Sequence, residues 1–213
     1  MTIAGQRLGA PSPQNLGSPT LHNSSIPALL IDSTIAATAA PNRVRDLAAV
    51  QSNAANGTLT IRRRFVNNTG AAVTLLRFRI MDISAFLPPG PVADLRALTS
   101  GAVTVNGIAD SATCLAANGV ATTPCTITVQ GTTLETPPAQ PLGGGLYSSM
   151  SAGTITLATP LAPGASIDLQ FLLGVQQPGS FKFFINIETL GGGAPAAPTT
   201  TIIRTSVTKP KSR

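Results

Sequence analysis

Residues 57–83 have the sequence GTLTIRRRFVNNTGAAVTLLRFRIMDI, in which two runs of alternating apolar and polar residues flank an Asn-Asn-Thr-Gly turn. In the first run, Leu59, Ile61 and Phe65 share one parity, and the second run, at 73–83, alternates in the same way. A period of two residues is typical of strands with one buried face. The sequence therefore predicts two strands joined as a hairpin in a layered β protein.

The rest of the chain repeats this pattern, with runs of Thr, Val, Ile and Leu separated by Gly and Pro. Further strands are expected at 28–36, 102–105, 126–135, 153–157, 166–175 and 180–188. Two segments, 44–50 and 94–100, are ambiguous between a strand and a helical turn. Short strands at this spacing predict an all-β, antiparallel sandwich of about nine to ten strands with Ig-like or jelly-roll connectivity.

The composition divides the chain into three parts. Residues 1–27 are rich in Pro, Ser, Gly and Asn and predict an irregular arm, and residues 28–190 form the sandwich. Residues 191–213 contain a Gly/Pro tether, a strand pattern at 199–207 and a basic tail. That strand either completes its own sandwich or is donated to a neighbouring subunit, which would build a filament. The candidate donor residues are Thr201, Ile202, Ile203, Thr205 and Val207.

The charge content is low: 10% of the residues are charged, against about 25% in typical globular domains. A polar surface that is poor in charge suits extracellular β proteins. The net charge of +6 comes with no Trp and one Tyr, so nucleic-acid binding, which combines basic residues with aromatic stacking, is not expected. No apolar run reaches the roughly 18 residues of a membrane-spanning helix. The N-terminus lacks the features of a signal peptide. We therefore expect either non-standard export or a chain that ends a longer exported protein.

The two cysteines, Cys114 and Cys125, lie in CLAANGVATTPC, which we expect to be a loop between strands. This spacing predicts a local disulfide in an oxidising compartment, and the alternative is two reduced thiols. A metal site would need more Cys or His ligands, and the single histidine, His22, is far away in the sequence. No metal and no cofactor are expected.

The best candidate for a partner site is a set of four arginines on the polar faces of the hairpin strands: Arg62, Arg64, Arg77 and Arg79. A register that places Arg64 opposite Arg77 would crowd like charges on one outward face, which is destabilising without counter-charge. Asp168, Glu188 or an external anion such as an acidic polysaccharide would neutralise them. Alternatively, the guanidinium groups spread into solvent.

Catalysis is not expected. The lone histidine lies in the irregular arm, and the eight carboxylates are scattered singly along the sequence. Neither pattern provides the base and nucleophile, or the paired acids, of common hydrolytic sites.

Several segments, among them APNRVRDL, the 57–83 stretch and LAPGASIDLQFLLGVQQPGSFKFFINIE, resemble a C-terminal β-domain of large, mostly uncharacterised bacterial surface proteins with arrays of Ig-like repeats. The similarity extends from about Gly5 to Glu188. It implies secretion and a structural or adhesive role, and it brings no catalytic residues.

The sequence thus favours a non-enzymatic structural protein of the bacterial cell surface that self-associates through its termini. The alternatives are an adhesion or carbohydrate-binding module, against which the scarcity of Trp and Tyr counts, and a virion coat or decoration protein.

Overall fold

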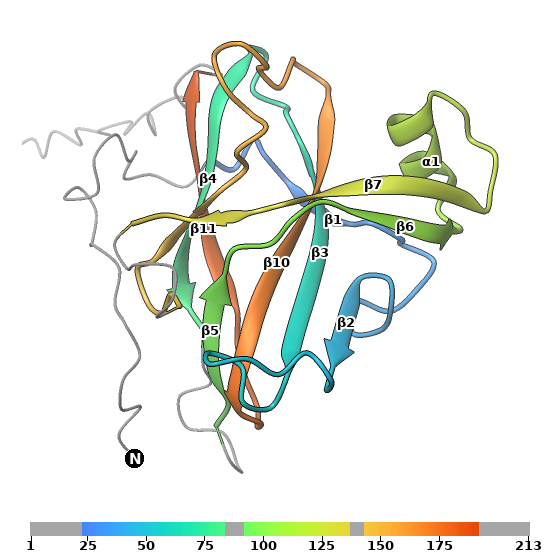
Figure 1. The fold of residues 1–213 in the computed structure, drawn as a ribbon. Helices are drawn as coiled ribbons and strands as arrows, with labels where there is room; N and C mark the ends of the chain where they lie inside the picture. Colours follow the sequence, from blue (N-terminus) through green and yellow to red (C-terminus); the bar gives the residue numbers. More distant parts are fainter. Residues whose placement is uncertain (1–22, 84–91, 137–142, 192–213) are drawn as a thin grey trace, which may run out of the picture.

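The computed structural model describes residues 23–83, 92–136 and 143–191. Within these ranges the chain forms two β-sheets packed face to face and one short helix (Figure 1). The prediction of an all-β sandwich is confirmed. The candidate donor strand at 199–207 lies outside the described residues, as do His22 and most of the predicted N-terminal arm.

The larger sheet is built around the antiparallel pair β3 and β10, which runs from Ser166 opposite Val66 to Gly174 opposite Thr58. On the outer edge of β3, β1 and β2 pair with opposite ends of the strand. On the outer edge of β10, β5 and β7 do the same, and β6 pairs with β7. The seven strands are β1 (Ala28–Leu30), β2 (Arg43–Asp46), β3 (Thr58–Val66), β5 (Asp94–Leu98), β6 (Val103–Ile108), β7 (Cys125–Gly131) and β10 (Ser166–Gln177).

The smaller sheet has the strand order β11-β4-β9-β8, so β11 is at its edge. Its strands are β4 (Val73–Asp82), β8 (Thr133–Leu134), β9 (Ser149–Ser151) and β11 (Phe184–Gly191). The described residues therefore contain eleven strands, one more than the upper expectation, and the pair β7–β10 is parallel rather than antiparallel.

Several details of the strand prediction are wrong. The strands expected at 28–36 and 180–188 are β1 and β11, but β1 ends at Leu30 and β11 begins at Phe184. The strand expected at 126–135 is two strands, because the chain leaves the larger sheet after Gly131 and enters the smaller one at Thr133. A side chain at Gly131 would meet the Ser100 carbonyl oxygen at 1.9 Å, so the crossing requires glycine. The segment 153–157 forms turns, and the neighbouring strand is β9. The two ambiguous segments contain strands, β2 and β5.

The predicted hairpin at 57–83 is also wrong, because β3 and β4 belong to different sheets. Their apolar faces meet across the interior instead: the rings of Phe65 and Phe78 lie 4.7 Å apart, and Phe171 of β10 is 5.0 Å from Phe78. All three side chains are buried. Alternation determines which face of a strand is buried but does not determine its hydrogen-bonding partner, and packing face to face buries both apolar faces at once.

The connection between β3 and β4 is held by the buried side chain of Asn67. Its amide nitrogen donates to the carbonyl oxygens of Ala71 and Leu161, both at 2.8 Å, and its oxygen accepts from the backbone and hydroxyl of Thr69. Gly70 has a φ of 79°, a conformation that favours glycine. These bonds direct the chain from one sheet to the other.

A helix, α1 (Ser111–Asn118), occupies the predicted loop between the cysteines. The Asp110 carboxylate accepts a 3.0 Å bond from the Thr113 backbone at its start, and the left-handed residue Gly119 ends it. Together with β6 and β7, α1 projects from the side of the sandwich (Figure 1). This unit has a small apolar core of its own, made of Ile31, Val105, Ile108, Cys114, Ile127 and Val129.

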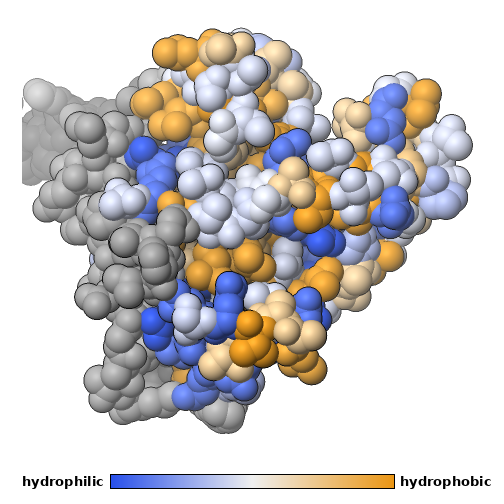
Figure 2. Space-filling view, viewed as in Figure 1, coloured by the Kyte–Doolittle hydropathy of each residue, from blue (hydrophilic) through white to orange (hydrophobic). Residues whose placement is uncertain are grey.

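Much of the face shown in Figure 2 is covered by pale residues of intermediate hydropathy. This agrees with the low charge content of the sequence, in which Thr, Ser and Gly take the place of charged surface residues.

Candidate functional site

The four predicted arginines do not form one exposed face. Arg64 lies opposite Asp168 on β10, and its Nε and Nη2 donate to the two carboxylate oxygens at 2.8 and 2.6 Å. Both side chains are buried, and Arg64 also donates to the carbonyl of Ala112 in α1. The outer face of β3 is therefore covered by α1 at Arg64.

The arginines of β4 are paired in the same way. Arg79 donates to both carboxylate oxygens of Glu188 on β11, at 2.8 and 3.3 Å, and Glu188 is fully buried. Arg77 pairs with Glu135 at 3.0 Å. The bidentate Arg79–Glu188 pair fixes geometry as well as charge.

Arg62 is half-buried and donates to the side chain of Gln170 at 3.2 Å, and burial lowers its pKa. The predicted register, with Arg64 opposite Arg77, is wrong because the two strands are not paired. Neutralisation by Asp168 and Glu188, one of the expected alternatives, is what the structure shows for Arg64 and Arg79.

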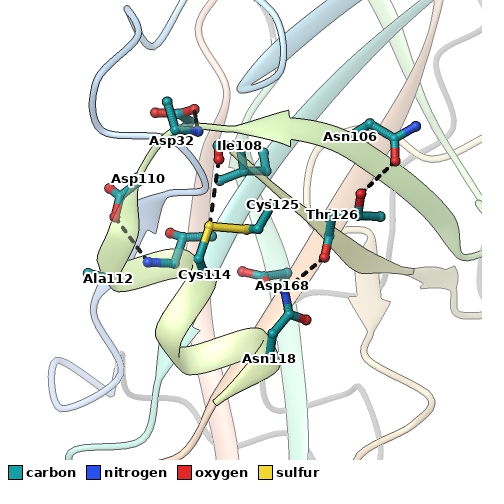
Figure 3. Close-up of a disulfide and its surroundings, with 12 residues drawn as sticks. Asp32, Asn106, Ile108, Asp110, Ala112, Cys114, Asn118, Cys125, Thr126 and Asp168 are labelled. Carbon is teal, nitrogen blue, oxygen red and sulfur yellow. Dashed lines mark hydrogen bonds between the residues drawn. A yellow bond between two sulfur atoms is a disulfide. The ribbon is translucent and has the colours of Figure 1, made fainter. Parts of the chain in front are cut away.

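The predicted disulfide is present between Cys114 and Cys125 (Figure 3). It ties α1 to the start of β7. The buried Cys114 contributes to the small core. On the same unit, Asn118 donates to the Thr126 carbonyl at 3.0 Å. The disulfide and this hydrogen bond both connect α1 to β7 within the projecting unit.

The helix cap also connects this unit to the loop after β1. The Ser33 hydroxyl and backbone donate to the Asp110 carboxylate. Burial raises the pKa of Asp110, but hydrogen bonds from Ser33, Thr113 and Ala112 outweigh it and lower the pKa below the ordinary value of 3.8.

The described residues form an apolar groove of about 540 Å³. It lies between the β1 and β3 side of the larger sheet and the β11 side of the smaller one. Phe171 and Phe183, whose rings are 5.7 Å apart, contribute to its lining, with Ile61, Ile185 and Ile187. Its size is within the range of about 300–1,000 Å³ that is usual for ligand pockets.

Two guanidinium groups line this groove, those of Arg43 and Arg63. Arg43 lies over the ring of Phe181, 5.9 Å from its centroid, and donates to the Thr38 carbonyl. Arg63 donates to the carbonyls of Asn42 and Arg62. Burial and the charge of Arg43 together lower the pKa of Arg63. Among the described residues, neither arginine has a carboxylate within ion-pair distance.

Sequence reasoning missed this groove, although one signal pointed to it. Arg63 shares the parity of Leu59, Ile61 and Phe65, so it interrupts an otherwise apolar strand face. A charged residue at a core-facing position predicts either a buried ion pair or a site that opens to solvent.

The chain approaches and leaves the sandwich at the β11 edge. The Asn23 backbone donates to the Ile187 carbonyl at 2.8 Å, and the Asn23 side chain donates to Thr189. Ile26, predicted to belong to the irregular arm, is buried in the core. β11 itself continues into the segment that contains the tether and the candidate donor strand.

In the part of the chain that the structure describes, no group of three or more His, Cys, Asp or Glu residues is arranged to hold a metal ion. No helix in that part is both long and apolar enough to cross a membrane. Comparison with protein-family models, curated proteins and solved structures finds no match to this chain. The resemblance to bacterial surface proteins therefore stays a prediction.

Proposed function

We propose that this protein is a non-enzymatic structural or interaction subunit of the bacterial cell surface that assembles with neighbouring copies by strand pairing through its termini. The observation that carries the proposal is the position of β11. It is an edge strand, and it leads directly into the Gly/Pro tether and the strand pattern at 199–207. A strand on a tether can add to the sheet of a neighbouring copy, where its main-chain hydrogen bonds supply affinity and its alternating side chains fill pockets.

Two further features support an extracellular location. The Cys114–Cys125 disulfide is typical of proteins in oxidising compartments. The low charge content is typical of extracellular β proteins, and it also suits a surface that packs against copies of itself.

An adhesin that binds an anionic glycan through the four arginines is not favoured. Arg64, Arg77 and Arg79 are buried and have carboxylate partners within the chain, so their charges are already neutralised.

The test uses two adjacent substitutions in the candidate donor strand. Val207 has the same parity as the candidate donor residues Ile203 and Thr205, which would face one side of the donated strand, and Ser206 has the opposite parity. Val207→Asp should abolish assembly, as should truncation after residue 198, because a charge cannot enter an apolar pocket without a partner. Ser206→Asp adds the same charge on the other face and should leave assembly intact.

Light scattering after gel filtration measures the particle mass, and circular dichroism verifies that each variant is folded. Equal assembly of the parent, Val207→Asp and the truncated chain would rule out strand pairing through the C-terminal segment.

A further inference from the structure

We propose that the groove between the two sheets binds an aliphatic carboxylate, with the alkyl chain among the phenylalanine rings and the carboxylate at Arg43 and Arg63. This inference does not depend on the proposed assembly. It follows from the lining of the groove, its uncompensated charge and the distribution of acidic residues in the chain.

The apolar part of the lining defines the body of the ligand. Three phenylalanines, Phe171, Phe181 and Phe183, and four isoleucines present hydrocarbon surface to the groove. An inorganic anion would gain nothing from this surface and would lose hydration there. An alkyl chain gains free energy with each methylene removed from water.

The charge at the groove defines the head group. The guanidinium groups of Arg43 and Arg63 repel each other, which contributes to the lowered pKa of Arg63. A carboxylate between them would relieve the repulsion and accept charge-assisted hydrogen bonds, for which the planar guanidinium group is well suited. A neutral or cationic ligand would leave the repulsion in place.

The protein does not supply this counter-charge from its own side chains. Its eight Asp and Glu residues are Asp32, Asp46, Asp82, Asp94, Asp110, Glu135, Asp168 and Glu188, and none forms an ion pair with Arg43 or Arg63 in the described structure. The terminal segments 1–22 and 192–213 contain Arg and Lys but no Asp or Glu. Their side chains are therefore electrostatically mismatched to this groove, in the same chain or in a second copy.

The experiment is calorimetric titration of the full-length protein with decanoate below its micelle concentration, compared with decanol and decyltrimethylammonium. Decanoate should bind saturably at one site per chain, and decanol at least about tenfold more weakly, since it lacks the charge-assisted bonds. Decyltrimethylammonium should not bind.

Three variants locate the site. Arg63→Gln should weaken decanoate binding at least about tenfold. Arg62→Gln makes the same change of charge at the next residue, on the opposite face of β3, and should leave the affinity within about twofold. Ala28→Trp places an indole at an exposed position on the groove lining and should abolish binding without removing a charge.

The proposal is overturned if decanoate does not saturate, if decanol binds equally well, or if Arg62→Gln and Arg63→Gln have equal effects. It is also overturned if Ala28→Trp changes the particle mass in light scattering, because the groove would then hold a segment of a neighbouring chain. Titration of the Val207→Asp variant separates the two proposals, since decanoate should bind to it whether or not the chains assemble.

Discussion

At the scale of single residues, the outer faces of the two sheets contain buried charged groups that are neutralised in pairs. Arg64 and Asp168 lie side by side on β3 and β10 and are both buried. Removing two charges from water is costly, and their mutual attraction and hydrogen bonds offset that cost only while both partners are present. We therefore expect the pair to specify the strand register more than to add net stability.

This predicts an asymmetry between single and double substitutions. Asp168→Asn leaves a buried guanidinium without its counter-charge and should lower the free energy of unfolding by about 3–5 kcal/mol. The combination Arg64→Met and Asp168→Leu should recover most of that loss. Urea denaturation measures all three proteins, with Lys182→Met, at an exposed position, as the control. A double variant no more stable than Asp168→Asn would contradict this account.

A second residue-scale prediction concerns pH. Because the pKa of Asp110 is lower in the folded protein, its ionised form stabilises the fold above the ordinary pKa of 3.8, which holds in the unfolded chain. This contribution disappears as the pH falls through the folded value. The parent should be more stable than Asp110→Asn at pH 7, and the difference should shrink steadily below about pH 4. Thermal unfolding from pH 7 to pH 2 tests this, and a difference independent of pH would refute it.

At the scale of elements, alternation predicted several strands but not their partners. The patterns at 58–66 and 166–175 correspond to β3 and β10. The pairing of β3 was mistaken because an Asn-Asn-Thr-Gly sequence is compatible with a hairpin turn as well as with a crossing between sheets. The difference lies in the bond from Asn67 to Leu161, which is distant in sequence and therefore invisible to local reasoning.

The adjacent residues Asn67 and Asn68 provide a direct test of this connection. Asn67→Ala would remove the side-chain donor to the carbonyls of Ala71 and Leu161, leaving the latter only the Val73 backbone N–H, and would remove the bonds from Thr69. It should cost at least about 2 kcal/mol in the free energy of unfolding. Asn68→Ala, at an exposed position, should cost less than about 0.5 kcal/mol. Equal costs in urea denaturation would show that Asn67 does not hold the connection.

The helix α1 was missed for a different reason. Only Thr113 and Cys114 among its residues are buried, so its apolar periodicity is weak. The signals that were present are the capping residues, Asp110 before the helix and Gly119 after it.

The disulfide holds this helix in place and makes a separate prediction. Cys125 is only partly buried, so Cys125→Ser removes the covalent bond with little change in packing. In air the free energy of unfolding of the variant should be lower by about 3 kcal/mol. This is the free energy that corresponds to the loop-closure entropy of the unfolded chain for a loop of this length. In the presence of a thiol reductant the parent and the variant should unfold at nearly the same temperature. A parent that melts identically with and without reductant would contradict a stabilising role.

At the scale of the whole molecule, composition and periodicity predicted the all-β sandwich, because they reflect how much apolar surface must be buried. The paired arginines could not be predicted as buried. Arg64 is on the outer face of β3 and contacts α1, which follows much later in the chain, and the partners of Arg77 and Arg79 are also distant in sequence. In the sequence, the parity of Arg63 on β3 is the one signal that pointed to the groove. Its other walls come largely from β1, β11 and the loops beside them, which are distant from β3 in sequence.

The central claim is that the chain is a structural subunit that pairs with its neighbours through the strand beyond β11. The most direct test is the mass and shape of the full-length protein in solution, by light scattering after gel filtration and negative-stain microscopy of the same fractions. The account predicts linear particles whose masses are multiples of 21.6 kDa and increase with concentration. A single species of 21.6 kDa at every concentration would contradict it.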